Sequence, residues 1–299
     1  MALNNLDDLV TFLTVVDSKS FSSAARIMNQ TPSSVSKQIA RLEAALSISL
    51  FERNTRKIKI TDEGKTVAKH VRTVLTILEN ISNIDNKGNT NLEGNIKITA
   101  PVAFGEKYIT KEIISFVKKH PDINFNLQLT DRILDIYSNN LDLALRFGQL
   151  TDSRLIATPL ATSERILVAS PEYVKKHLIS HPNELKNHNC LLFSYPGLLQ
   201  QTWFLCTSEQ QIEIIVSGNL RSDNSQAIKV WCIAGLGIAL REKWDVSDEI
   251  GTGKLVRILP DWKEKETTVN IIRARREPIP RRVRAFIDYL TNEWKNSKF

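Results

Sequence analysis

Residues Ser20 to Arg56 read SFSSAARIMNQTPSSVSKQIARLEAALSISLFERNTR, and this stretch decides the fold of the N-terminal part. Apolar residues recur in it every three or four positions in two runs, a spacing that places each run on one face of a helix. Pro32 opens the second run, where proline suits a first helical turn. The stretch therefore predicts two short amphipathic helices joined by a tight polar turn, which is a helix-turn-helix unit. The runs are Phe21, Ala24, Ala25 and Met28, then Val35, Ile39, Leu42 and Leu46.

The outward face of the second predicted helix carries small hydroxyls, an amide and two cations. Such groups hydrogen-bond phosphates and base edges, so this face is a candidate DNA-contacting surface with its N-terminal serines leading into a major groove. An ordinary solvated helix face is the alternative, because serine, lysine and glutamine are common at protein surfaces. The candidate DNA-binding residues on this helix are Pro32, Ser33, Ser34, Ser36, Lys37, Gln38 and Arg41.

Two further elements are expected directly after this unit. Residues 57–60 alternate lysine and isoleucine, which predicts a short two-stranded wing that carries cations. Thr61 is placed to cap a long helix. Along that helix apolar residues follow at alternating intervals of four and three, which predicts a heptad seam for pairing with a second copy; a helix lying on its own domain is the alternative. The seam consists of Val67, Val71, Val74, Leu78 and Ile81.

At this point the sequence resembles the LysR-type transcriptional regulators. The resemblance covers about the first sixty residues, and it includes Ser20-Phe21, Ala24-Ala25, residues 35–39 and Leu50-Phe51-Glu52-Arg53. It implies a winged helix-turn-helix domain (1–65), a linker helix for dimerisation (66–88) and a hinge (89–94). It also implies that Arg56 reaches the minor groove while Arg53 supports or contacts the DNA backbone. Ser47 departs from the glycine that the family usually has after the recognition helix, where a left-handed C-cap favours glycine.

Length and composition fit this organisation. A chain of 299 residues with 42% hydrophobic and 24% charged residues is long enough for two or three domains, each with its own core. The net charge of +7 favours an anionic partner only mildly. No targeting segment and no apolar run long enough for a membrane span is found, so a cytoplasmic protein without membrane contact is expected. Three widely spaced cysteines, Cys190, Cys206 and Cys232, fit reduced thiols better than disulfides or zinc ligands.

From residue 95 to residue 299 strand-like and helix-like stretches alternate, which predicts an α/β domain with mostly parallel sheets. The pattern resembles the two-lobed effector domain of the same family, similar to periplasmic binding proteins, with lobe one at 95–163 and 267–299 and lobe two at 164–266. The overall expectation is an α/β protein with an all-α N-terminal part. The strand-like stretches are 96–99, 124–129, 142–148, 165–170, 212–217, 237–240 and 269–272, and the helical ones are 108–119, 225–234 and 281–294.

An effector site is expected where strands end and helices begin, because loop amides and helix N-termini face the crevice there. By resemblance these loops line the effector-binding crevice between the lobes. Arg146 is the natural cation for an acidic ligand, and a structural arginine paired with Asp131 or Asp142 is the equal alternative. Trp203 is a candidate pocket floor, with a simple core residue as its alternative. The candidate effector-binding residues are Thr99, Pro101, Val102, Ala103, Phe104, Thr130, Arg146, Phe147, Trp203 and Ser225.

Other signals are weaker. His177, His181, His188 and Cys190 are better explained as a loop end than as a metal site, and the arginine cluster at 273–284 as a solvated face. No nucleophile motif or phosphate-binding loop occurs, so neither catalysis, metal nor cofactor is expected. The sequence predicts a DNA-binding regulator whose partners are double-stranded DNA, a small-molecule effector such as an organic acid, a second copy of the chain in a dimer or tetramer, and RNA polymerase as a candidate. A solute-binding protein or an enzyme on the two-lobed domain is the rival interpretation.

Overall fold

The computed structural model describes residues 5–54, 57–82, 92–148, 152–275, 278–295 and 297. The chain forms two compact units, Met1–Thr90 with Arg276–Arg281, and Asn91–Arg275 with Arg282–Phe299. Residues 89–91 of the predicted hinge (89–94) and residues 83–88 of the predicted linker helix lie outside the described residues.

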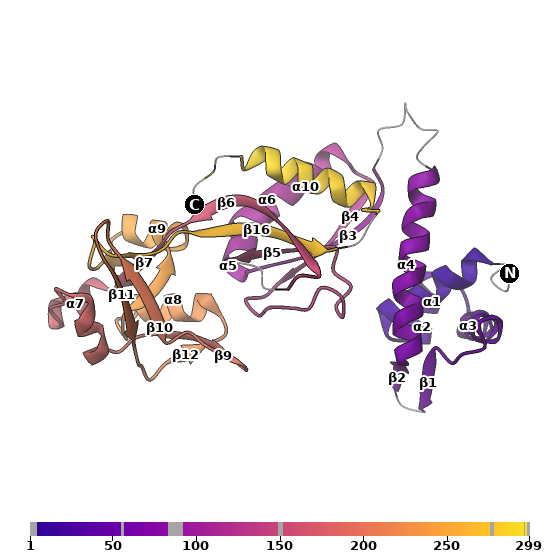
Figure 1. The fold of residues 1–299 in the computed structure, drawn as a ribbon, viewed down its shortest axis with the longest axis horizontal. Helices are drawn as coiled ribbons and strands as arrows, with labels where there is room; N and C mark the ends of the chain where they lie inside the picture. The colour runs from indigo at the N-terminus through magenta and orange to yellow at the C-terminus, as the bar shows by residue number, and fades with distance from the viewer. Residues whose placement is uncertain are drawn as a thin grey trace. The chain divides into compact units, whose positions relative to one another are not determined.

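The first unit is a helical domain with a β-hairpin (Figure 1). Side chains at the N-termini of its first three helices accept hydrogen bonds from backbone amides: Asn5 from Asp7, Ser20 from Ser23 and Thr31 from Ser34. These caps fix where each helix begins and confirm the predicted helix-turn-helix. The elements are α1 (Leu6–Ser18), α2 (Phe21–Ile27), α3 (Pro32–Leu46), β1 (Phe51–Asn54), β2 (Lys57–Ile60) and α4 (Asp62–Ser82).

The hairpin is fixed to the helices by buried contacts. Glu43 on α3 accepts the amide of Leu50 at 2.7 Å, and the Thr61 hydroxyl accepts the amide of Gly64 at 2.9 Å. Gly64 has to be glycine, because a Cβ atom there would lie 2.4 Å from the carbonyl oxygen of Leu50. The ring of Phe51 meets those of Phe12 and Phe21 edge-on. The wing therefore belongs to the same core as the three helices.

The second unit has two lobes. In the first lobe a five-stranded sheet has the order β4-β3-β5-β16-β6. Helices α6 and α10 pack against each other beside it, with Phe116 and Phe286 in ring contact at 5.0 Å. The strands are β3 (Gly94–Ala100), β4 (Ile123–Leu129), β5 (Leu143–Phe147), β6 (Leu155–Ser163) and β16 (Thr267–Ala274). The helices are α5 (Val102–Phe104), the π-helical turn η1 (Gly105–Ile109), α6 (Thr110–Lys119) and α10 (Arg281–Glu293).

The second lobe contains three small sheets, ordered β13-β7-β14, β12-β8-β9 and β11-β10-β15. Its strands are β7 (Arg165–Ala169), β8 (Leu192–Tyr195), β9 (Leu198–Leu199), β10 (Thr202–Cys206), β11 (Gln211–Ile215), β12 (Arg221–Ser222), β13 (Ala239–Glu242), β14 (Val256–Arg257) and β15 (Lys263–Glu264). Its helices are α7 (Pro171–Lys176), η2 (Pro182–Asn187), α8 (Ser225–Ile233) and α9 (Lys243–Gly251).

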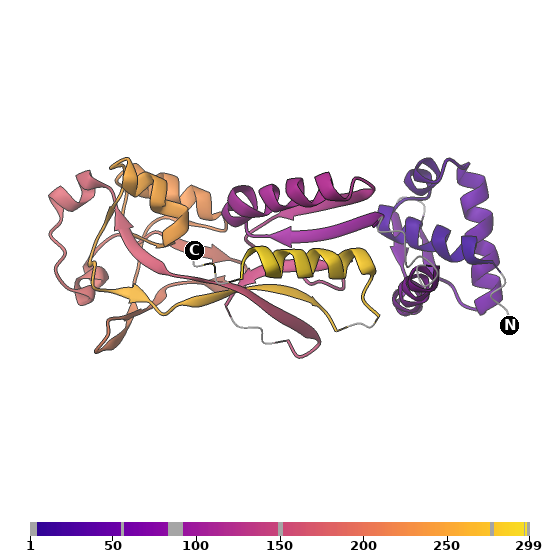
Figure 2. The ribbon, with the colours of Figure 1, turned by 90° about the horizontal axis from the view of Figure 1, so that it is seen from above.

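The two lobes are joined by β6 and β16, which run side by side from one lobe to the other (Figure 2). These strands pair antiparallel, and β16 also pairs antiparallel with β5. Only β3 pairs in parallel with both of its neighbours among the described strands of the five-stranded sheet. The prediction of mostly parallel sheets was therefore wrong, because alternation along the chain does not reveal that two strands return across the lobe boundary. None of the helices in the described part of the chain is long and apolar enough to cross a membrane.

Candidate DNA interface and effector site

Helix α3 presents a polar face to solvent and an apolar face to the core. Val35, Ile39 and Leu42 are buried among the residues of α1, α2 and α4. Pro32, Ser33, Ser36 and Lys37 are exposed, and Ser34 is half-buried. The Ser34 hydroxyl donates to Gln30 at 3.4 Å. The helix therefore leaves two hydroxyls and one ammonium group open to a partner from its first two turns.

Two of the candidate DNA-binding residues also hold α3 to α1. The Arg41 guanidinium makes two hydrogen bonds to the buried carboxylate of Asp8, one of them from Nε at 2.6 Å. This hydrogen bond raises the pKa of Arg41 further above its usual value. Gln38 accepts a hydrogen bond from the buried Thr11 hydroxyl at 2.8 Å. The sequence analysis did not identify Asp8 and Thr11 as partners, because they precede Arg41 and Gln38 by 33 and 27 positions.

Within the described residues, the wing formed by β1 and β2 adds little to the candidate DNA interface. Arg53 lies in β1 opposite Ile58, whereas Arg56 falls outside the described residues. The Lys59 ammonium is 3.1 Å from Glu52 on the facing strand, and both side chains are exposed. An exposed pair of this kind is worth little to stability, so Lys59 is available to an anionic partner.

The apolar residues of α4 are divided between two faces. Ala68 and Val71 are buried in the core of the first unit, and Val67 packs against it. Val74 and Ile81, by contrast, are 42% and 54% exposed, and Ile77 is exposed beside them. The N-terminal part of the predicted seam thus packs on its own domain, in agreement with the alternative interpretation. The C-terminal part forms an exposed apolar face.

In the second unit most of the predicted effector residues meet at the carboxyl ends of β3, β4 and β5. Thr99 is fully buried near the end of β3, and its hydroxyl accepts from Arg146 on β5 at 3.3 Å. Phe104 and Phe147 are in edge-to-face contact at 5.3 Å. Pro101 precedes α5, to which Val102, Ala103 and Phe104 belong, and Thr130 follows β4.

Arg146 is surrounded by neutral acceptors. Its guanidinium donates to the carbonyl oxygens of Arg132 at 3.0 Å, Leu145 at 3.1 Å and Thr130 at 3.4 Å, besides the Thr99 hydroxyl. Burial lowers the pKa of Arg146 to about 10, and the nearby Asp131 charge acts in the opposite direction. A cation that is desolvated in this way and touches no carboxylate of the described residues provides a positive field for an anion.

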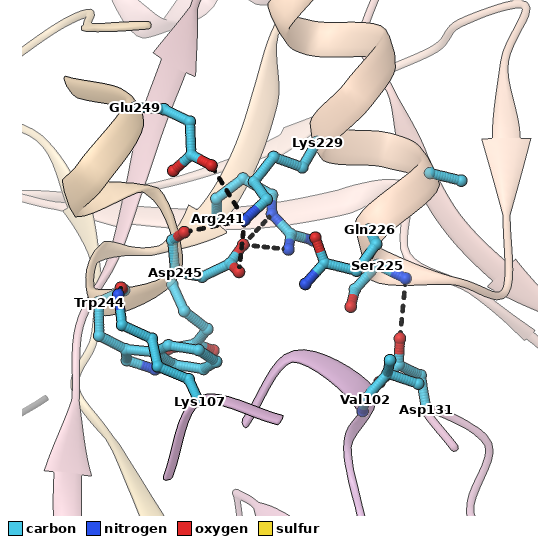
Figure 3. Close-up of polar contacts among 12 residues, drawn as sticks. Val102, Lys107, Asp131, Ser225, Gln226, Lys229, Arg241, Trp244, Asp245 and Glu249 are labelled. Atoms are coloured by element: carbon cyan, nitrogen blue, oxygen red, sulfur yellow. Dashed lines mark hydrogen bonds and ion pairs between the residues drawn. The ribbon is translucent and has the colours of Figure 1, made fainter. Parts of the chain in front are cut away.

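Asp131 provides that anion. Its Oδ1 accepts the backbone amide of Val102 at 2.8 Å, and its Oδ2 accepts the backbone amide of Ser225 at 2.8 Å. Val102 opens α5 in the first lobe and Ser225 opens α8 in the second, so one carboxylate joins the lobes (Figure 3). Sequence analysis considered Asp131 only as a partner for Arg146 and did not place it among the site residues.

Trp203 is not among the residues that meet there. It lies on β10 with 3% of its surface exposed, packed in the hydrophobic core of the second lobe with Leu205 and Ile214. The structure therefore supports the alternative that Trp203 is a core residue. The indole that does lie at the lobe boundary is that of Trp244 on α9, whose ring contacts Phe104 at 5.4 Å.

Two more polar contacts join the lobes. The Arg132 guanidinium donates two hydrogen bonds to the Asp223 carboxylate, one of them from Nε at 2.8 Å. Lys107 donates to the carbonyl oxygen of Trp244 at 2.8 Å (Figure 3). It also pairs with Asp248 at 3.2 Å. Behind them Lys229, Arg241, Asp245 and Glu249 form a mostly buried ion-pair cluster inside the second lobe (Figure 3). Polar contacts therefore join the two lobes at several points, beside the aromatic contact of Phe104 with Trp244.

The described part of the chain holds no group of three or more histidines, cysteines and acidic residues suited to a metal ion. His177 and His188 lie with their rings 5.7 Å apart beside Tyr173, and burial lowers the pKa of His188. In the C-terminal arginine cluster, Arg282 donates to the carbonyl oxygen of Asn95 at 2.9 Å.

A winged helix-turn-helix unit together with a two-lobed domain defines a class of DNA-binding regulator. Comparison with known families agrees: residues 6–65 match the bacterial regulatory helix-turn-helix protein, lysR family, and residues 89–295 match the LysR substrate binding domain. The chain belongs to the LysR family of transcriptional regulators. It has a DNA-binding helix-turn-helix part and an effector-binding domain, which confirms the family, fold and function expected from the sequence.

Individual relatives resemble the chain over nearly its full length. The HTH-type transcriptional activator TtdR of Escherichia coli K12 is 32% identical over 286 residues, covering 95% of this chain and 91% of the relative. DmlR of the same strain, an HTH-type transcriptional regulator, is 32% identical and covers 87% and 86%. Among solved structures, the Vibrio cholerae virulence activator AphB has 27% identity, a TM-score of 0.59 and coverage of 96% and 99%. CrgA of Neisseria meningitidis has 27% identity, a TM-score of 0.61 and coverage of 98% and 100%.

Proposed function

We propose that this regulator binds its operator through the exposed side of α3 and the wing, as a homo-oligomer paired through α4. An acidic small molecule that binds between the two lobes then changes operator affinity. The observation that carries the DNA part is the exposure of Ser33, Ser36 and Lys37 on a helix whose opposite face is buried. Pro32, Ser34, Gln38, Arg41, Arg53 and Arg56 complete the proposed DNA-binding residues.

Lys37 is the side chain best suited to test this interface. It is exposed, and its loss uncovers no buried charge, unlike the loss of Arg41. If the Lys37 ammonium neutralises one phosphate, Lys37→Ala should lower the slope of log affinity against log salt by about 1. The measurement is an electrophoretic shift on the DNA just upstream of this protein's own reading frame, repeated over a range of salt concentrations. Lys69→Ala on α4, also at an exposed lysine, is the matched control. Equal slopes in both variants would show that Lys37 neutralises no phosphate.

The open apolar face of α4 supports the oligomer. Val74, Ile77 and Ile81 share one side of the helix at intervals of three and four, and each is more than one-third exposed. An apolar stripe of this length is better covered by a second copy than left in water. Two copies would place two α3 helices on the two half-sites of a palindromic operator.

The lobe boundary supports the effector part. Buried Thr99, the desolvated Arg146 and the amides of Val102 and Ser225 gather polar groups beside the aromatic rings of Phe104 and Phe147. Apolar walls with a few convergent polar groups are typical of small-molecule sites. The positive field of Arg146 and the backbone amides together favour an acidic ligand. Pro101, Ala103 and Thr130 belong to the same proposed site.

Three further parts of the proposal concern the protein in its cell. We place it in the cytoplasm, where its DNA lies. RNA polymerase is its proposed partner at the promoter, and its role is regulatory rather than enzymatic. We also propose the domain bounds 1–65, 66–88, 89–94 and 95–299.

A coupling free energy of about 1–3 kcal/mol between effector binding and operator binding would change operator affinity five- to hundredfold.

A further inference from the structure

The carboxylate of Asp131 occupies the place that an acidic effector would be expected to take. Each of its oxygens accepts one backbone amide at 2.8 Å, Val102 in the first lobe and Ser225 in the second. Both amides stand at the start of a helical segment, where no earlier carbonyl of the helix can accept them. A carboxylate is the group that such amides bind best. Both donors are therefore satisfied by the chain itself.

Arg146 holds this carboxylate in place through the backbone on either side of it. Its guanidinium donates to the carbonyl oxygens of Thr130 and Arg132, the two residues that flank Asp131. Its charge also attracts the Asp131 carboxylate, although the two side chains do not form an ion pair. Arg132 also reaches across the lobe boundary, because it binds Asp223 in the second lobe. The loop that carries Asp131 is thus anchored on both lobes.

We propose that Asp131 is an internal competitor for the carboxylate of an acidic effector. This inference rests on the proposed effector site and adds how access to it is regulated. Asp131 closes the lobe boundary while the site is empty, and an acid binds by displacing it from the amides of Val102 and Ser225. A tethered group acts at an effective concentration in the millimolar range or above, so a simple acid at a lower concentration cannot compete.

The proposal predicts that removal of the Asp131 side chain opens a site for a free carboxylate. Amide hydrogen exchange at Val102 and Ser225 reports it directly, because both amides lose their acceptor in Asp131→Ala. In the full chain we expect both amides to exchange faster in this variant than in the wild type. Sodium acetate, compared with sodium chloride at the same ionic strength, should slow them again by roughly tenfold at ten times its dissociation constant. Acetate should leave both amides of the wild type unchanged.

Two further variants keep the test decisive. Asp131→Asn retains the shape of the side chain but turns an NH₂ group toward one of the two amides, so one amide should lose protection even if Asp131→Ala fails to fold. Asp223→Ala removes the neighbouring ion pair with Arg132 and leaves the Asp131 carboxylate in place. In that variant acetate should have no effect, which separates a vacated carboxylate position from a general loosening of the lobes.

The outcomes distinguish this inference from the proposed function. Unchanged exchange at Val102 and Ser225 in both Asp131 variants, or acetate protection equal in the wild type and Asp131→Ala, would overturn the role of Asp131. Neither result concerns DNA. Acetate protection restricted to Asp131→Ala would support the role of Asp131. If screening then finds no acid that alters operator affinity, this result would count only against the proposed acidic effector.

Discussion

The guanidinium of Arg41 on α3 binds the buried carboxylate of Asp8 on α1, with Nε donating at 2.6 Å. A cation on the helix proposed to contact DNA therefore also neutralises a charge inside its own domain. A buried carboxylate without a partner lowers the free energy of unfolding, so the ion pair holds the two helices together. The remaining donors of the guanidinium are free to point outward, since 58% of this side chain is exposed.

Arg41→Ala should consequently lower thermal stability as well as DNA affinity. The stability loss comes from Asp8, which would be left buried and unpaired. Differential scanning fluorimetry of the full chain should show a lower unfolding midpoint for Arg41→Ala than for Lys37→Ala, since Lys37 has no such partner. Adding Asp8→Asn to Arg41→Ala should restore much of the midpoint but not the DNA affinity. If the double variant is as unstable as Arg41→Ala, the ion pair does not explain the loss.

The helices of the first unit could be predicted because local rules determine them. The spacing of Val35, Ile39 and Leu42 and the capping hydroxyls of Ser20 and Thr31 are visible in the sequence, and the structure uses all of them. The bond between Asp131 and Ser225 could not be predicted in this way, because the two residues are 94 positions apart and carry no shared pattern. Their meeting depends on how one lobe packs on the other.

For the strands of the second unit, the sequence likewise predicts local features but not long-range pairing. The stretches that became β3, β4 and β5 were identified from their apolar residues, and so was the stretch that became β16. The direction in which β16 pairs depends on the path of the chain through the second lobe, which periodicity does not encode. The residues of the candidate effector site could be named from the sequence because strand ends and helix starts meet at one edge of a sheet.

Ser47 provides a prediction about stability. It ends α3 in the left-handed conformation with φ 55°. A side chain in this conformation is strained, so Ser47→Gly should raise the free energy of unfolding by about 0.5–1 kcal/mol. Urea denaturation measures the difference. Ser49→Gly in the same loop is the control and should be neutral or destabilising, because its backbone is not left-handed. A stabilisation equal in both variants would contradict the cap argument.

The open face of α4 gives a prediction about assembly. Val74→Glu together with Ile81→Glu would place repelling carboxylates in the proposed dimer contact, where each lost apolar contact is worth roughly 1–3 kcal/mol. Light scattering should show a smaller oligomer, and operator affinity should fall with it. Both positions are largely exposed in the single chain, so its fold should persist. Lys69→Glu, on another side of the same helix, should leave the oligomer intact. An unchanged mass in the Val74 and Ile81 variant would show that copies pair elsewhere.

The thiols give a prediction about reactivity. Burial raises the pKa of Cys190 and of Cys232 to about 12, from an ordinary value of 9.0. At pH 8 their thiolate fraction is therefore about a thousandfold lower than that of an ordinary cysteine, and the thiolate is the reactive form. Iodoacetamide should label the native chain at the half-buried Cys206 and leave the other two unlabelled, whereas all three should react in urea. Mass spectrometry of the digested protein locates the label, and fast native labelling of Cys232 would contradict its burial.

The same two thiols make stability depend on alkaline pH. The unfolded chain releases their protons near pH 9, whereas the folded chain retains them up to about pH 12. The folded state therefore binds more protons over this interval, and its stability falls as the pH rises through it. The drop in the free energy of unfolding between pH 8 and pH 10 should be smaller in a Cys190→Ala, Cys232→Ala variant than in the wild type. If the double variant loses as much stability as the wild type, other groups that titrate in this range govern the alkaline limit.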